Sequence, residues 1–117
     1  MTEATVEIAA FHDASAAGKV LASLVPDQEA RAVAEIFQLL ADPTRVRLIA
    51  ALRHADLCVS DLAQIMGLTE SAISHQMRDL RLRRLVSSRR DGRHVYYSLK
   101  DHHVRHLLED TLKHVKE

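Results

Sequence analysis

Residues 57–99 read "LCVSDLAQIMGLTESAISHQMRDLRLRRLVSSRRDGRHVYYSL", and this stretch decides the fold. Apolar residues at helical spacing predict a short amphipathic helix that ends at Gly67, which breaks the pattern. Thr69 is suited to begin a second helix, because a threonine hydroxyl accepts a backbone N–H from the first turn. Two helices joined by a tight glycine turn predict a helix-turn-helix over residues 58–83.

The second helix is expected to have two different sides. Ile73, Met77 and Leu80 follow one another at four and three residues, which places them on one apolar side. Another side carries polar and basic residues, and such side chains reach base edges or phosphates when a helix lies in the major groove. The residues predicted to do so are Ser71, Ser74, His75, Gln76 and Arg78.

The pattern changes to alternation after the second helix. Asp91–Gly92 predicts a two-residue type I′ turn, because such a turn needs positive φ at both central positions. A β-hairpin is therefore expected over residues 86–99, and Arg89, Arg90 and Arg93 would hold the DNA backbone or minor groove there. A helix-turn-helix followed by a basic hairpin is typical of a winged helix, so the expected fold is mainly α with a small β-hairpin.

Charge is distributed unevenly along the chain. The formal net charge is zero, with 16 Lys and Arg against 16 Asp and Glu, so the total charge indicates no partner. Eight cations lie between Ser71 and Lys100 against two acidic residues, and such a local basic patch is consistent with a nucleic-acid footprint. A solvated basic face is the alternative. The hairpin, the glycine turn and the polar helix side agree with one another and favour double-stranded DNA as the partner.

Length and composition limit the other classes of function. A chain of 117 residues is expected to form one domain, residues 1–117, with a helix or arm over residues 1–25. No apolar run approaches the roughly 20 residues of a membrane span, so no membrane partner is expected. The single cysteine excludes an internal disulfide and suits the cytoplasm. The sequence has no HExxH, nucleophile motif or glycine-rich phosphate loop, so an enzyme is not expected.

Residues 101–117, "DHHVRHLLEDTLKHVKE", contain four of the eight histidines and predict a closing helix that Asp101 can cap. His103 and His114 are eleven residues apart and point within about 20° of each other, and Glu117 lies about one turn beyond His114. The Asp101–His103 and His114–Glu117 pairs are nevertheless about 16 Å apart along the helix. Zinc holds its N and O donors at roughly 2.0–2.2 Å, so one chain cannot bring all four to a single ion.

An antiparallel copy of the same helix across a two-fold axis removes this difficulty. Asp101 and His103 of one subunit then face His114 and Glu117 of the other, and the symmetry gives two equivalent sites per homodimer. The seam between the two helices consists of His103, Leu107, Asp110, His114 and Glu117. It is mostly polar, and it makes a poor hydrophobic interface unless its polar groups bind a metal.

Other interpretations of these histidines remain open. Histidines on a terminal helix can be solvated or can pair locally. His102 and His106, at i and i+4, can also chelate a metal weakly within one chain. A separate apolar stripe on this helix is expected to pack on the core, and it consists of Val104, Leu108, Leu112 and Val115.

Four segments resemble the ArsR/SmtB family of metal-sensing repressors, and in particular its zinc-sensing SmtB branch. They are "LADPTRVRLIAAL", "LCVSDLAQIMGLTESAISHQMRDLRLRRLV", "DGRHVYYSL" and "DHHVRHLLEDTLKHVKE", and the resemblance covers roughly residues 30–117. It implies a homodimeric winged helix with the N- and C-terminal helices at the dimer interface. It also implies a repressor whose metal-free form binds operator DNA, typically at a metal efflux or sequestration gene, and whose operator affinity falls when metal binds.

The resemblance extends to the metal ligands. The C-terminal-helix site of the branch pairs Asp and His of one subunit with His and Glu of the other, and these ligands match Asp101, His103, His114 and Glu117. Imidazole and carboxylate donors at four-coordination suit Zn(II), two ions per dimer, with Co(II) as a surrogate. The alternative is a repressor of the same type that responds to Co(II), Ni(II) or Cd(II), or to redox change at Cys58.

One departure from the family pattern concerns Cys58. Soft-metal sensors of the family often carry Cys-Val-Cys at this place, whereas this chain has Cys58-Val59-Ser60 and lacks the second thiolate. Some relatives build a second metal site from this cysteine, a nearby Asp and N-terminal ligands. Cys58 and Asp61 match that set, and His12 is the N-terminal candidate. The other interpretation of Cys58 is a small buried hydrophobe.

Overall fold

The computed structural model describes residues 7–117, which fall into two units divided after Ala34. The first unit contains a short 3₁₀ turn, η1 (Ile8–Ala10), and the helix α1 (Ala14–Ala22). These elements occupy part of the arm predicted over residues 1–25, of which residues 1–6 lie outside the described residues. Helix α2 (Asp27–Leu40) begins in the first unit and ends in the second.

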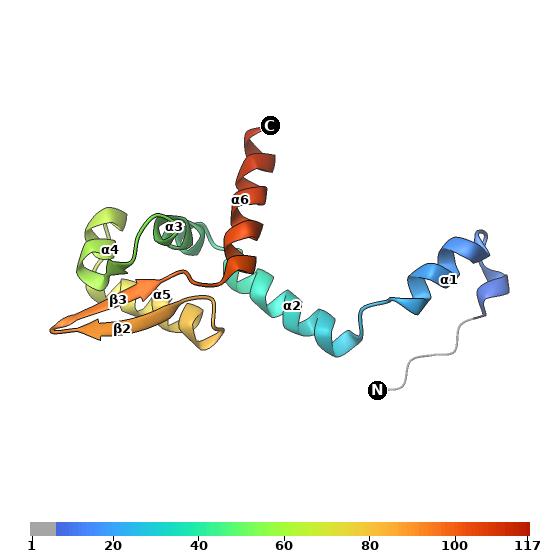
Figure 1. Cartoon of the computed structure of the whole chain (residues 1–117), viewed down its shortest axis with the longest axis horizontal. Coiled ribbons are helices and arrows are strands. Elements are labelled where there is room, and N and C mark those ends of the chain that lie inside the picture. Colours follow the sequence, from blue (N-terminus) through green and yellow to red (C-terminus); the bar gives the residue numbers. More distant parts are fainter. Residues whose placement is uncertain (1–6) are drawn as a thin grey trace. The chain divides into compact units, whose positions relative to one another are not determined.

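The second unit is mainly helical and contains one small sheet, as the sequence predicts (Figure 1). After the end of α2 its elements are α3 (Pro43–Leu52), β1 (Leu57–Cys58), α4 (Val59–Met66), α5 (Glu70–Leu82), β2 (Ser87–Asp91), β3 (His94–Ser98) and α6 (His102–Lys116). Helices α4 and α5 pack against each other, and the β2–β3 hairpin, or wing, follows them in the chain. This arrangement is the winged helix-turn-helix expected from the sequence. No helix within residues 7–117 is long and apolar enough to cross a membrane.

Local sequence signals set the ends of the helices. α3 begins where the Asp42 carboxylate accepts the N–H of Arg45 at 3.0 Å. α4 ends at Gly67, whose φ of 67° lies in the left-handed region that favours glycine. α5 begins where the Thr69 hydroxyl accepts the N–H of Ala72 at 3.1 Å. The glycine turn and the threonine cap predicted from the sequence are therefore confirmed.

The core lies where α3, α4 and α5 meet the sheet. Ile73, Met77 and Leu80 are fully buried, which confirms the apolar side predicted for α5. This burial holds α5 by one side and leaves its polar side outward. The other buried residues of the core include Leu48, Ile49, Leu52, Leu62, Leu85, Val86, Tyr97 and Leu99.

The sheet has the strand order β1–β3–β2, and both pairings are antiparallel. Asp91 pairs with His94, so the central residues of the hairpin turn are Gly92 and Arg93. Among the described residues, φ is positive at Gly92 (61°) but not at Arg93. The predicted hairpin is confirmed, whereas the type I′ turn at Asp91–Gly92 is wrong. Positive φ at the first central position alone corresponds to a type II′ turn, and glycine supplies it there.

The sequence pattern does not indicate β1. Its two residues pair with Tyr97 and Tyr96 of β3, and two residues are too few to show alternation. Cys58 lies in this strand and is only 5% exposed. That burial agrees with its interpretation as a small buried hydrophobe.

α6 packs on the core at its start and projects from it at its end (Figure 1). Val104 is buried, Leu108 and Leu112 are half-buried, and Val115 is 73% exposed. The apolar stripe therefore packs on the core only in part, and for Val115 the prediction is wrong in a single chain. The stripe residues line an apolar groove of about 530 Å³, together with other residues from α6, from α3 and from the end of α2.

Candidate functional site

Helix α5 turns its predicted DNA-facing side outward. Ser71, His75 and Arg78 are exposed, and Ser74 is half-buried. The opposite side is anchored in the core by Met77 and its neighbours, so core packing fixes which residues of α5 face solvent. A helix with short polar side chains and an arginine outward can enter a major groove and offer donors and acceptors to base edges. We therefore call α5 the recognition helix.

Among the predicted contact residues of the recognition helix, Gln76 is the one whose side chain forms a hydrogen bond within residues 7–117. Its Oε1 accepts a hydrogen bond from Arg45 Nε at 2.7 Å. The same guanidinium lies 3.4 Å from the Asp79 carboxylate and donates to the carbonyl oxygen of Leu39 at 3.3 Å. Arg45 thus ties α3 to the recognition helix and to the end of α2. The amide NH₂ of Gln76 remains a donor, but its carbonyl oxygen helps to position the helix.

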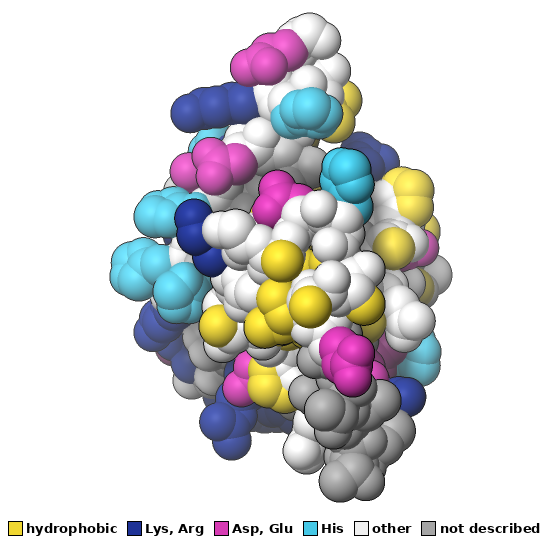
Figure 2. Space-filling view, turned by 90° about the vertical axis from the view of Figure 1, so that its right-hand side faces the viewer, with side chains coloured by type: hydrophobic (Ala, Val, Ile, Leu, Met, Phe, Trp, Pro, Cys, Tyr) yellow, Lys and Arg dark blue, Asp and Glu magenta, His cyan; other side chains and the backbone are white. Residues whose placement is uncertain are grey.

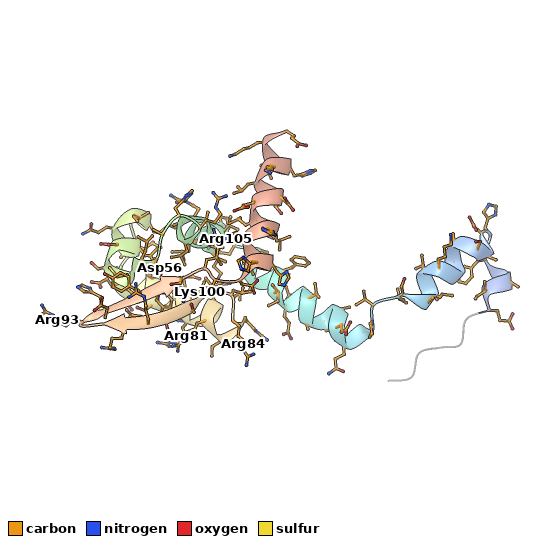
Figure 3. All side chains as sticks on the ribbon, viewed as in Figure 1. Asp56, Arg81, Arg84, Arg93, Lys100 and Arg105 are labelled. Atoms are coloured by element: carbon orange, nitrogen blue, oxygen red, sulfur yellow. The ribbon has the colours of Figure 1, made fainter. Side chains whose placement is uncertain are left out.

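The three wing arginines differ in their surroundings. The Arg89 guanidinium lies over the Tyr96 ring at 4.5 Å from its centroid, and its Nη2 is 4.0 Å from Asp56. Arg89 is therefore held along the sheet. Arg93 projects from the tip of the hairpin (Figure 3), and Arg90 is exposed on β2. Neither of these two makes a salt bridge within residues 7–117, so both charges face solvent.

Three further cations lie where the recognition helix, β2 and the start of α6 come together. They are Arg81, Arg84 and Lys100, labelled in Figure 3. The sequence includes them in the basic patch but gives no reason to separate them from the other arginines. The signal that could have marked Arg81 is its spacing, since it follows Ser74 and Arg78 at i+7 and i+3 on the outward side of α5.

Asp101 stands at the start of α6, as predicted. Its Oδ1 accepts the N–H groups of His103 at 2.8 Å and Val104 at 3.2 Å. Both capping bonds use Oδ1, and no hydrogen bond to Oδ2 is formed within the described part of the chain. The carboxylate can therefore cap the helix through one oxygen and donate to a metal ion through the other.

The remaining predicted metal ligands are exposed along α6. His103 lies at its start, and His114 and Glu117 lie at its end. Figure 2 shows histidine and acidic side chains interspersed where α6 projects. Within residues 7–117 of one chain, no three His, Cys, Asp or Glu side chains come together as a metal site. A single chain thus brings Asp101 near His103 but not near the other pair, as the eleven-residue spacing predicts.

The residues of the second predicted metal site lie on different elements. Cys58 is buried at the start of α4 and Asp61 is exposed in the first turn of that helix. His12 is exposed in the first unit, just before α1. The second site stays a prediction.

Arg105 is a residue whose role the sequence does not reveal. Its Nη1 donates to the carbonyl oxygen of Arg53, just after α3, at 2.9 Å. Its Nη2 donates to the carbonyl oxygen of Leu99, just after β3, at 2.9 Å. One guanidinium therefore connects the start of α6 to the wing and to α3. An arginine on a helix surface is usually solvated, and these carbonyl partners become neighbours only in the folded chain.

Comparison with known proteins gives consistent matches over this unit. Residues 42–88 match the family described as "Bacterial regulatory protein, arsR family". The chain is 53% identical over 89 residues to a transcriptional repressor SmtB homolog of Synechocystis sp.. The aligned region covers 76% of this chain and 67% of that protein. It is 45% identical over 87 residues to the HTH-type transcriptional regulator NmtR of Mycobacterium tuberculosis, covering 74% and 72%.

Solved structures show the same fold. The AntR antimony-specific transcriptional repressor superimposes with a TM-score of 0.74 at 37% identity, over 80% of this chain and 86% of that one. A homodimeric winged helix-turn-helix DNA-binding domain from Mycobacterium bovis superimposes with a TM-score of 0.71 at 23% identity, over 81% and 91%. The second match concerns the fold alone.

Proposed function

The chain belongs to the arsR family of bacterial regulatory proteins, and from this premise we propose that it is a metal-responsive transcriptional repressor. Its metal-free homodimer binds double-stranded operator DNA in the cytoplasm. Zn(II) releases it and so derepresses genes for metal efflux or sequestration. The observation that carries the metal assignment is the arrangement of donors on α6, with one Asp–His pair at its start and one His–Glu pair at its end.

The DNA-binding part of the proposal is supported by the outward side of the recognition helix and by the wing. Ser71, Ser74, His75 and Arg78 can reach base edges and phosphates in the major groove. Arg90 on β2 and Arg93 at the hairpin tip are available to bind backbone or minor groove. Arg89, which lies on Tyr96, keeps its charge near the same surface.

The metal part is supported by the chemistry of the donors. Two imidazoles and two carboxylates form a set that suits tetrahedral Zn(II), and Co(II) is the natural spectroscopic surrogate. Asp101 and His103 of one protomer would combine with His114 and Glu117 of the other, giving two ions per dimer. The Asp101 cap leaves Oδ2 for this purpose, and the other three side chains are exposed.

Regulation requires only that Zn(II) favour one form of the dimer. If zinc prefers a form that fits the operator poorly, it shifts the population away from DNA. By reciprocity, operator DNA then lowers zinc affinity by the same factor. In this chain Arg105 joins the start of α6 to the wing, so a displacement of α6 on ligand binding reaches the residues that hold DNA.

Other effectors can be examined in the DNA-binding titration described below. Co(II), Ni(II) or Cd(II) can occupy a site built from imidazole and carboxylate. A redox response through Cys58 is disfavoured, because the residue is only 5% exposed and reactive cysteines are accessible.

The decisive experiment is a titration of a fluorescent duplex carrying the protein's own promoter region, with and without Zn(II). We expect Zn(II) to weaken binding by roughly 5–150-fold, the usual range of such coupling. His103→Ala should bind DNA normally and lose the response. His106→Ala is the matched control, since His106 is exposed on the same helix but outside the ligand set, and it should respond like the original protein. Zinc-insensitive binding by the unmodified protein contradicts the proposal, and release by a thiol reagent instead would favour the redox alternative.

A further inference from the structure

A second concave feature of the unit lies at the base of the wing. The end of the recognition helix, the start of β2 and the residues at the start of α6 border an open pocket of about 370 Å³. Its polar lining consists of Arg81, Arg84, Ser87, Ser88, Lys100 and Asp101. No residue of this pocket except Asp101 takes part in the proposed metal site, and none belongs to the DNA contacts predicted from the sequence.

The pocket is strongly positive. Arg81, Arg84 and Lys100 bring three positive charges against the single carboxylate of Asp101, and that carboxylate already accepts two backbone N–H groups. Within residues 7–117 none of the three cations forms a salt bridge. The pocket therefore holds an excess of positive charge, and such self-repulsion destabilises the free protein. An anion in the pocket would remove this repulsion.

The backbone at Arg84 points to the same conclusion. Arg84 has φ of +61°, and among the described residues it is the only non-glycine with positive φ. It follows the recognition helix in a left-handed turn, in which the N–H of Leu85 reaches the carbonyl oxygen of Leu80 at 3.0 Å. Glycine is the residue suited to this position, and an L-residue costs about 1 kcal/mol there. The chain places a long cationic side chain where the backbone alone would favour glycine.

The pocket also continues the DNA-facing side of the recognition helix. Arg81 lies on that side, seven residues after Ser74 and three after Arg78. Its Nη1 donates to the hydroxyl of Ser88 on β2 at 3.3 Å. The outward side of α5 therefore runs without interruption into the base of the wing.

We propose that this pocket binds a backbone phosphate of the DNA duplex through Arg81, Arg84 and Lys100. The proposal rests on the proposed DNA-binding function and adds a contact outside the bases that the recognition helix reads. Guanidinium groups match the oxygens of a phosphate in geometry and charge, and the serine hydroxyls at the pocket wall can donate to the same group. A phosphate contact fixes register and orientation and carries no sequence information, so this contact is independent of the DNA sequence.

The test uses Arg84→Gly, because glycine suits the backbone at this position and the variant should fold at least as well as the original. Affinity for a fluorescent 30-base-pair duplex of arbitrary sequence is measured over a range of KCl concentrations, with metal removed by a chelator. The slope of log K against log[salt] should become shallower by roughly 0.9 for each phosphate that the protein no longer neutralises, and a dimer has two such pockets. Lys100→Gln should make the slope shallower in the same way. The thermal unfolding temperature of Arg84→Gly should stay unchanged or rise.

Two controls separate this contact from a general effect of charge. Arg84→Lys keeps the cation and should keep most of the slope. Lys116→Gln removes one charge at the other end of α6 and should leave the slope unchanged, because charges beyond the Debye length of about 8 Å are screened at physiological salt. If Arg84→Gly and Lys100→Gln both keep the original slope and affinity, the proposal is overturned.

A second arm distinguishes DNA phosphate from a free anion. Inorganic phosphate is titrated into the metal-free protein and followed by calorimetry. Binding of inorganic phosphate together with unchanged DNA slopes in the variants would assign the pocket to a small anion and overturn the DNA contact. If the unmodified protein binds no duplex at all, the proposed function fails as well. If the unmodified protein binds the duplex and the variants keep its salt slope, only the proposed phosphate contact in the pocket is overturned.

Discussion

Asp101 combines two roles that ordinary substitutions can separate. One oxygen caps α6 through the N–H groups of His103 and Val104, and the other is the proposed metal donor. Asparagine caps helices about as well as aspartate but is a poor ligand for Zn(II), whereas alanine neither caps nor binds.

The first prediction follows from this difference. In metal-free protein, Asp101→Ala should lower the free energy of unfolding by about 1 kcal/mol and Asp101→Asn should change it little, as measured by urea denaturation. Both variants should lose Zn(II) affinity in a chelator competition. Tight zinc binding by Asp101→Asn would remove Asp101 from the ligand set.

The second prediction concerns Arg105. Its guanidinium satisfies the carbonyl oxygens of Arg53 and Leu99, both in partly buried surroundings. Arg105→Ala leaves both acceptors without this partner and should lower the free energy of unfolding by about 1–3 kcal/mol. Arg105→Lys can restore at most part of that loss, because an ammonium does not span two carbonyls as a planar guanidinium does. A loss below about 0.5 kcal/mol in urea denaturation, typical of a surface change, would contradict this role.

At the scale of residues, the sequence predicts what depends on near neighbours. The Thr69 and Asp101 caps lie within three residues of their partners, so local chemistry is enough to predict them. The bond from Arg45 to Gln76 spans 31 residues and the bond from Arg105 to Arg53 spans 52. These pairs form only after the helices have packed, and for that reason no sequence pattern reveals them.

At the scale of elements, the two sides of the recognition helix should respond differently to substitution. Met77 is fully buried and Arg78, its neighbour, is exposed. Met77→Ala should lower the free energy of unfolding by about 2–5 kcal/mol, the usual range for such a core truncation. Arg78→Ala should leave stability within about 0.5 kcal/mol and weaken DNA binding. Thermal unfolding and fluorescence anisotropy on both variants check this pair. Equal loss of stability in the two would mean that α5 is not oriented as described.

The hairpin shows why an element can be predicted more easily than its register. Glycine next to charged residues indicates a turn, but both Asp91–Gly92 and Gly92–Arg93 are suitable central pairs. The two turns would pair Tyr97 with Val86 or with Ser88. Because these two partners lie on the same face, alternation does not choose between the registers, and the structure has Tyr97 opposite Ser88. Neither the turn residues nor the alternation therefore reveals the register.

At the scale of the whole molecule, the proposed metal site depends on dimerisation. Leu107 lines the apolar groove beside α6, is 39% exposed and lies on the predicted seam between the two α6 helices. Leu107→Glu should shift the protein from dimer to monomer in sedimentation velocity, because a carboxylate in an apolar contact is costly.

Zinc affinity should fall together with dimerisation, since each site takes ligands from two chains. Ile65→Glu on α4 is the control: Ile65 is also exposed, but it lies outside the groove, and this variant should stay dimeric. A monomeric Leu107→Glu that binds zinc with unchanged affinity would show that one chain supplies the whole site.

The candidate site as a whole could be predicted from the sequence only in part. The eleven-residue spacing on α6 is enough to show that one helix cannot close around an ion, because helix geometry is nearly constant. The pocket at the base of the wing could not be predicted, since it joins three elements and depends on the backbone conformation of Arg84.

The bonds of Arg45 have a consequence for how an operator is chosen. Because one guanidinium fastens the recognition helix to α3 and to the end of α2, this helix cannot tilt without breaking several polar contacts. Each protomer should therefore meet DNA as a rigid body, and what an effector can change is the separation of the two recognition helices in the dimer. Half-sites one turn of DNA apart lie at about 34–36 Å, so a small change in that separation places the second helix out of phase with its groove.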